Sequence, residues 1–132
     1  LRRVIDRHEG LRVHGQAISV ERVAMRAGLA ALDGHAADAH AGYRDVLDSW
    51  RELGLAWDEA MTGLEMATVL DRSEPDVAAA IDRSIEIFDR IRARPFLERL
   101  QRLEAGEDAT HAIVAEASAP IAVSATPGPA PD

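Results

Sequence analysis

Apolar residues recur at steps of three and four along most of the chain, which is the spacing of a helix face. No stretch of useful length alternates polar and apolar residues with a period of two. Composition agrees, because alanine, the strongest helix former, occurs 25 times and aromatic residues make up 4% of the chain. The spacing is clearest at Val20, Val23, Ala27, Ala30 and Ala31, and then at Tyr43, Val46, Leu47, Trp50 and Leu53. The sequence therefore predicts an all-α fold.

Residues that start and stop helices divide the chain into several expected helices. Ser19 is a candidate N-cap, as is either Ser73 or Glu74, and Pro75 suits the first turn of the helix that follows. Gly34 and Gly54 follow apolar runs, where a glycine commonly ends a helix. These signals predict helices at about 1–12, 18–33, 36–53, 57–72, 76–93 and 96–105.

The chain also resembles itself at an offset of 38 residues. Apolar character matches at positions expected to be buried, while charged positions do not match, as in a structural repeat. Matching pairs include Val23 with Met61, Leu29 with Ala67, Tyr43 with Ile81, and Trp50 with Phe88. Each unit would be a pair of helices joined by a short turn. The sequence thus predicts a short α-solenoid of tandem antiparallel helix hairpins, with a closed four-helix bundle as the alternative.

The expected organisation is one helical-repeat domain followed by a tail. The domain covers residues 1–106, with repeat units at about 18–54 and 56–94 and terminal helices at 1–12 and 96–105. Residues 107–132 hold four of the six prolines and no arginine, which predicts a flexible, mostly irregular Pro/Ala-rich tail. The repeat predicts that large apolar side chains of both units are buried together: Tyr43, Trp50, Leu53, Leu64, Ile81, Ile85 and Phe88.

Composition excludes several kinds of site. The chain has no cysteine, so disulfides, thiolate metal sites and cysteine nucleophiles are excluded. It has no lysine, which a phosphate-binding P-loop requires. The basic residues number 15, all arginine, against 23 acidic residues, and the net charge of −8 opposes nucleic-acid binding. No apolar run reaches the roughly 18 residues of a membrane span, so we expect a cytoplasmic protein. We also expect no cofactor.

Histidines, carboxylates and tryptophans form no pattern that indicates catalysis. His35 and His40 are five residues apart, whereas two metal ligands on one helix face need a spacing of three or four. Asp58 fits the acidic first turn of a helix. Trp50 and Trp57 are expected in the core rather than in an aromatic ligand site. The sequence therefore predicts no catalytic residue, no cofactor site and no metal site.

Two parts of the chain resemble known families. The unit resembles a tetratricopeptide repeat, with small residues in its first helix and an Ala-x3-aromatic step from Ala39 to Tyr43. Its period differs from the usual 34 or so residues, and the Trp-Leu-Gly-Tyr signature is absent. Residues 50–100 are similar to the C-terminal end of large bacterial signalling ATPases, in WRELGLAWDEA (50–60), ATVLD (67–71) and RPFLERL (94–100). The resemblance implies helical repeats that, in those proteins, follow an ATPase domain and an adenylate or guanylate cyclase or DNA-binding regulator domain.

We therefore expect a non-catalytic interaction module. First helices line the inner curve in repeats of this type, so the candidate interaction surface is Arg22, Arg26, Ala60 and Leu64. The expected partner is a protein segment or a neighbouring domain of the same parent, a larger cytoplasmic signalling protein, and not nucleic acid or membrane. The chain starts at Leu1 within an amphipathic stretch, as a fragment would. Homo-oligomer formation is left open.

Two other functions also stay open. A small all-α enzyme would use arginines to hold an anionic substrate, and the opening LRRVID resembles that of chorismate-mutase-type helical enzymes. A helix-turn-helix DNA binder is the second alternative, although the negative charge and the lack of a basic recognition helix oppose it. The placement of Arg2, Arg3, Arg22 and Arg26 separates these functions: an enzyme needs them to converge in a pocket, and an interaction module needs them along an open groove.

Overall fold

The computed structural model describes residues 2–106, with side chains described from Gly10 onward. Within this range the chain forms five α-helices and no strand, which confirms the all-α class. The elements are α1 (Arg2–Leu32), α2 (Ala36–Leu53), α3 (Ala56–Val69), α4 (Pro75–Arg90) and α5 (Arg94–Glu104). Leu1 and the predicted irregular tail, residues 107–132, lie outside the described residues.

The first two expected helices are one continuous helix, α1, of 31 residues. Ser19 does not begin a helix, because its hydroxyl donates a hydrogen bond to the carbonyl oxygen of Gly15, 3.3 Å away, within α1. A bond from residue i to residue i−4 is how a serine inside a helix satisfies its hydroxyl. Gly15 weakens a helix by only about 1 kcal/mol relative to alanine. The predicted break between residues 12 and 18 is therefore wrong.

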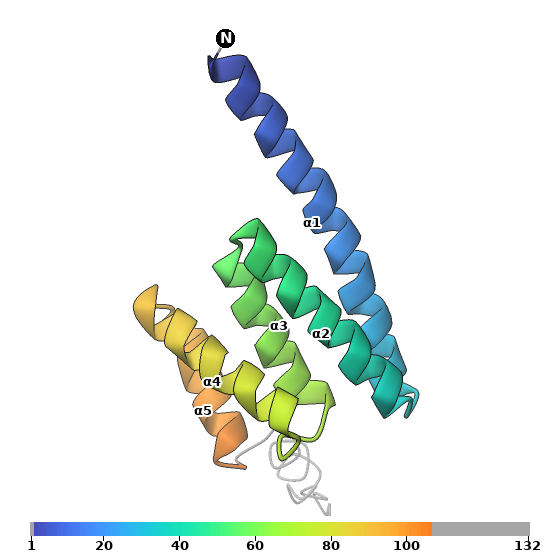
Figure 1. Ribbon diagram of the computed structural model, residues 1–132. Helices are drawn as coiled ribbons and strands as arrows, with labels where there is room; N and C mark the ends of the chain where they lie inside the picture. The colour runs from blue at the N-terminus through green and yellow to red at the C-terminus, as the bar shows by residue number, and fades with distance from the viewer. Residues whose placement is uncertain (1, 107–132) are drawn as a thin grey trace, which may run out of the picture.

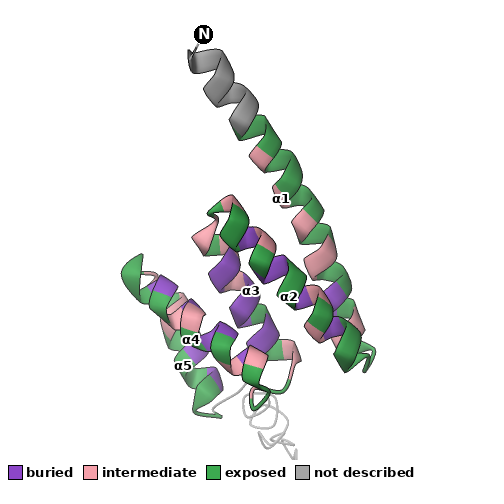
Figure 2. Cartoon of the chain, viewed as in Figure 1, coloured by how far each residue is buried: buried purple, intermediate pink, exposed green. Residues whose placement is uncertain are grey.

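Consecutive helices run antiparallel and pack against each other (Figure 1). The contacts of α1 with α2 and of α3 with α4 are the most extensive, so these helices form two hairpins. α3 also contacts α1, α2 and α5, and it is buried on several sides (Figure 2). The N-terminal end of α1 extends beyond the other helices (Figure 1).

Glycine, proline and glutamate stand at helix ends where the sequence predicts them. Gly34 and Gly54 have φ values of 81° and 69°, in the left-handed region that glycine adopts without steric cost. Pro75 begins α4, where the N–H that proline lacks is not needed. The residue before α4 is Glu74, whereas Ser73 lies in the connecting turn and hydrogen-bonds there to Asp71.

Most of the predicted core is buried. Five of the seven residues are at most 3% exposed: Tyr43, Trp50, Leu64, Ile81 and Phe88. The other two, Leu53 and Ile85, are half-buried. Trp57 is 43% exposed rather than in the core, and its ring packs edge-on against the rings of Phe88 and Phe96.

Small residues let the two helices of each hairpin approach closely. A Cβ atom on Gly42 in α2 would lie 2.9 Å from the Cβ of Ala27 in α1. In the second hairpin, a Cβ on Gly63 in α3 would meet the Ser84 hydroxyl and lie 2.7 Å from the Ala80 carbonyl oxygen in α4. These contacts fix which helix faces form each hairpin.

The two hairpins differ in the sequence separation of their close contacts. In the first hairpin the close contact joins Ala27 and Gly42, 15 residues apart, and in the second one such contact joins Gly63 and Ala80, 17 residues apart. The turn between α3 and α4 covers residues 70–74, two more than the turn over 33–35. The two hairpins therefore differ in the length of their turns.

Candidate functional site

A groove of about 540 Å³ involves the first helices of both hairpins. Its lining comes chiefly from α1 and α3, with Trp50 of α2 and Arg99 of α5 completing it. Because α3 contacts both α1 and α5, the packing that buries α3 also brings these three helices onto one face.

The floor of the groove is apolar. Met25 of α1 and Met61 and Val69 of α3 line it, together with Leu64, which is 3% exposed. Methionine is unbranched and polarisable, so it packs against apolar side chains of various shapes. Met25 is 62% exposed, and covering it with a second apolar surface would lower the free energy. The floor can therefore receive apolar side chains of a partner.

The rim of the groove is acidic. Glu21 of α1 and Asp58 and Glu65 of α3 provide three carboxylates, and Arg99 of α5 provides one guanidinium. The excess of negative charge at the groove has the same sign as the net charge of the whole chain, −8. A rim of this kind attracts cationic groups and repels anionic ones.

Two side chains of α2 donate hydrogen bonds to residues of α3 that line the groove. The Tyr43 hydroxyl donates a hydrogen bond to Oε1 of Glu65 at 2.6 Å. Burial, with this hydrogen bond and the nearby charge of Glu65, raises the pKa of Tyr43 well above its ordinary value, so the hydroxyl keeps its proton. Trp50 donates to the Thr62 hydroxyl at 3.0 Å, and that hydroxyl donates to the Asp58 carbonyl oxygen at 2.8 Å.

The four residues predicted to form the interaction surface are not together on the surface. Ala60 is fully buried, and Leu64 reaches only the floor of the groove, because α3 has neighbouring helices on several sides. Arg22 and Arg26 are exposed on α1 beside the groove but do not line it. Ala60 is therefore a core residue and not a surface residue. The side chains of Arg2 and Arg3, which would separate the alternative functions, lie outside the described residues.

The groove residues that the sequence did not reveal are immediate neighbours of the predicted ones. Met25 precedes Arg26, and Met61 follows Ala60. One residue turns a helix by about 100°, so the sequence placed these positions in helices but did not give the face of each helix that lines the groove. Two methionines in successive first helices were the available signal.

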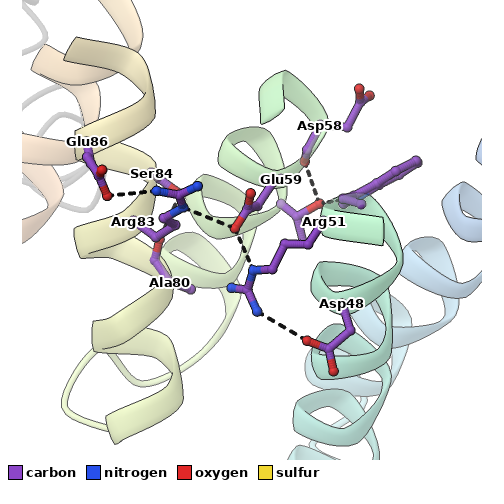
Figure 3. Close-up of polar contacts among 10 residues, drawn as sticks. Asp48, Arg51, Asp58, Glu59, Ala80, Arg83, Ser84 and Glu86 are labelled. Atoms are coloured by element: carbon purple, nitrogen blue, oxygen red, sulfur yellow. Dashed lines mark hydrogen bonds and ion pairs between the residues drawn. The ribbon is translucent and has the colours of Figure 1, made fainter. Parts of the chain in front are cut away.

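A buried carboxylate outside the groove joins three helices. Glu59 of α3 accepts hydrogen bonds at Oε1 from Arg51 of α2, at 2.7 Å, and from Arg83 of α4, at 3.4 Å (Figure 3). The two arginines also contact exposed carboxylates on their own helices, Asp48 and Glu86 (Figure 3). Because both guanidiniums bind the same carboxylate oxygen, the cluster connects α2, α3 and α4.

The histidines do not form a metal site with the neighbouring carboxylates. His40 of α2 hydrogen-bonds through Nδ1 to Asp76 of α4 at 2.7 Å, and His35 is exposed in a turn. Burial works against ionisation of Asp76, yet the bonds from His40 and from the Val77 N–H hold its pKa below the usual value. Among the described side chains, residues 10–106, three or more histidine, aspartate or glutamate side chains nowhere gather as a metal would require. Over residues 2–106, every helix is too short or too polar to cross a membrane.

Comparisons of the chain with protein-family models, with curated proteins and with solved structures give no match. The function of the groove is therefore argued from its own shape and charge.

Proposed function

We propose that this chain is a non-catalytic interaction module that binds a protein segment, or a neighbouring domain of its parent, in the groove of α1, α3 and α5. One observation carries the proposal. The exposed Met25 and the half-buried Met61 line the groove beside the carboxylates Glu21, Asp58 and Glu65. Apolar floors with charged rims suit the side chains of another polypeptide.

The order of helix contacts supports a short solenoid. α1 pairs with α2 and α3 with α4, while the first helices also contact in sequence, α1 with α3 and α3 with α5. Stacked hairpins present one continuous surface along their first helices. α5 buries Leu100 and Leu103 and exposes its charged side chains, as a helix that caps such a stack would. The proposed repeats are of the tetratricopeptide-like type that the sequence resembles.

The resemblance to bacterial signalling ATPases extends the proposal to the parent protein. The chain is then a regulatory region of a larger cytoplasmic protein that carries a cyclase or ATPase domain elsewhere. In that setting the groove contacts another part of the protein or a second protein.

Site-specific crosslinking tests the proposal. A photoreactive side chain is placed at Met25, which lines the groove, and in a control at Asp45, exposed on α2. The crosslinked polypeptide is identified, purified and titrated against the unmodified chain and the Met25→Asp variant. We expect crosslinking at position 25 alone and binding at least about tenfold weaker for the variant, a loss of 1.4 kcal/mol. Equal crosslinking at both positions with unchanged affinity would contradict the proposal.

A nucleotide titration separates this function from the enzyme alternative. The acidic rim repels phosphates, so we expect no saturable binding of ATP with magnesium to the purified chain. A dissociation constant of about 10 μM or tighter, roughly 7 kcal/mol of binding free energy, would favour an enzyme. Duplex DNA titrated at low salt checks the helix-turn-helix alternative in the same way.

A further inference from the structure

One face of α1 is apolar and unused by the fold. Five large apolar residues of α1 are 41% to 74% exposed: Leu11, Ile18, Met25, Leu29 and Leu32. Steps of seven, four and three residues place them along one narrow side of the helix. We call this side the α1 apolar face. It is about 32 Å long at 1.5 Å per residue.

The α1 apolar face continues into the groove. Met25 belongs to both surfaces, and across the groove from it lies Met61 of α3. The contact of α1 with α2 uses another side, at Ala27, which is 3% exposed. One elongated partner can therefore cover the α1 apolar face and the groove floor together.

Charge selects the partner. On the groove side, the α1 apolar face is bordered by Glu21, and Asp58 and Glu65 of α3 stand opposite. A partner with arginine or lysine on the flank that meets these carboxylates gains charge-assisted contacts. A second copy of this chain fits poorly because it has a net charge of −8, and the tail at 107–132 has no arginine or lysine.

The secondary structure of the lining residues favours a helical partner. All lining residues lie in helices, whose interior N–H and C=O groups bond within the helix, so the groove offers an extended peptide no strand edge to pair with. The chain has no asparagine, and glutamine does not line the groove, so side-chain amides cannot hold a peptide backbone there. A helical partner satisfies its own backbone groups and needs only side-chain contacts.

We infer that the α1 apolar face and the groove together bind one amphipathic α-helix of another protein, with a cationic flank directed at Glu21, Asp58 and Glu65. This inference rests on the proposed interaction function of the same groove. The apolar stripe of the partner packs on Met25 and Met61, and its cationic flank sets how it lies across them.

A designed helix is the probe. It has about 22 residues, the length of the α1 apolar face, with leucine at every third or fourth position and arginine along one flank. Glutamine fills the other flank and alanine the remaining positions. One control peptide replaces every arginine by glutamate, and another places a proline in the middle to break the helix. Fluorescence anisotropy follows each peptide titrated with the full chain at low and high salt.

We expect the arginine peptide to bind at least about tenfold more tightly than either control, and to weaken as salt rises. Met25→Asp and Glu21→Arg should each reduce its affinity by about tenfold or more. Asp45→Arg makes the same change of charge on the exposed side of α2 and should leave the affinity within about twofold.

Three results would overturn the inference. The glutamate peptide could bind as tightly as the arginine peptide, or the proline peptide could bind as tightly as the unbroken helix. In the third, no peptide binds and the chain sediments as a dimer that Met25→Asp dissociates, which would make a second copy the occupant. The proposed function fails on a different result. Crosslinking would be equal at positions 25 and 45, and Met25→Asp would leave the affinity for the crosslinked partner unchanged.

Discussion

Arg51 of α2 donates a 2.7 Å hydrogen bond from Nε to Oε1 of Glu59 in α3, and Arg83 of α4 reaches the same oxygen at 3.4 Å. The carboxylate is 4% exposed, whereas the two arginines are 48% and 38% exposed. Burial is thus unequal within the cluster. Loss of either arginine leaves a buried carboxylate with one partner, while loss of the carboxylate leaves two guanidiniums that can reach water.

Removing the buried carboxylate should weaken the joint between the hairpins. We expect Glu59→Ala to lower the free energy of unfolding by about 1–3 kcal/mol, because two charge-assisted hydrogen bonds are lost while both arginines regain water. Urea denaturation measures the change. Glu86→Ala is the matched control, since Glu86 is 63% exposed and its bond to Arg83 should contribute about 0.5 kcal/mol or less. Equal effects of the two substitutions would contradict the structural role of Glu59.

Two glycine-to-alanine substitutions should change the stability of the fold in opposite directions. Gly63→Ala puts a Cβ against the Ser84 hydroxyl and the Ala80 carbonyl oxygen, so we expect a loss of about 1–3 kcal/mol despite the better helix propensity of alanine. In α1, a Cβ on Gly15 would have no atom within 4 Å, so Gly15→Ala should stabilise the helix by up to about 1 kcal/mol. Thermal melts followed by circular dichroism compare both variants. If Gly63→Ala also stabilises the fold, the close approach of α3 and α4 is wrong.

Phe88 is the central aromatic side chain of the second hairpin. It is fully buried and its ring contacts those of Trp57 and Phe96, at centroid distances of 5.8 and 5.5 Å. We expect Phe88→Ala to cost about 3–5 kcal/mol, as for other large core residues. Leu32→Ala serves as the control, because Leu32 is 74% exposed and its truncation should change stability by less than about 0.5 kcal/mol. A loss below about 1 kcal/mol for Phe88→Ala would show that the ring is not in the core.

The positions of the helices could be predicted because each has local signals at its ends. The interval predicted for α2, 36–53, is the observed Ala36–Leu53, bounded by the glycines at 34 and 54. The continuity of α1 could not be predicted in this way. A serine has the same appearance in sequence whether it caps a helix or bonds to residue i−4 within one, and the choice depends on the length of helix that packing supports.

The faces of the first helices were harder to predict than their positions. The 38-residue offset pairs Leu29 with Ala67, yet Leu29 is 60% exposed and Ala67 is fully buried. The turn over 70–74 has two more residues than the turn over 33–35, and apolar spacing within a helix carries no information about turn length. α3 contacts α1, α2, α4 and α5, so its apolar pattern did not distinguish core from groove. Ala60 was therefore placed on the surface and Met61 was missed.

The bond between His40 and Asp76 should make stability depend on pH in the acidic range. Burial tends to raise the pKa of Asp76, but the hydrogen bond from His40 and the Val77 N–H outweigh it and lower the pKa below the usual 3.8. The unfolded chain, with the higher pKa, binds the proton more readily than the native chain does. The stabilisation is therefore complete above the unfolded value and is lost as pH falls through the lower, native value.

Asp76→Asn tests this dependence. Near neutral pH we expect the variant to be less stable by about 1 kcal/mol or less, because the pair is partly exposed to solvent and its charges are screened. The difference between the two proteins should shrink toward zero as the pH falls below about 3.8, where the wild-type carboxyl also takes up a proton. Urea denaturation at a series of pH values measures the difference, and Asp45→Asn on the exposed side of α2 corrects for the general loss of one negative charge. A difference that stays constant or grows toward low pH would mean that the Asp76 carboxylate does not stabilise the contact between α2 and α4.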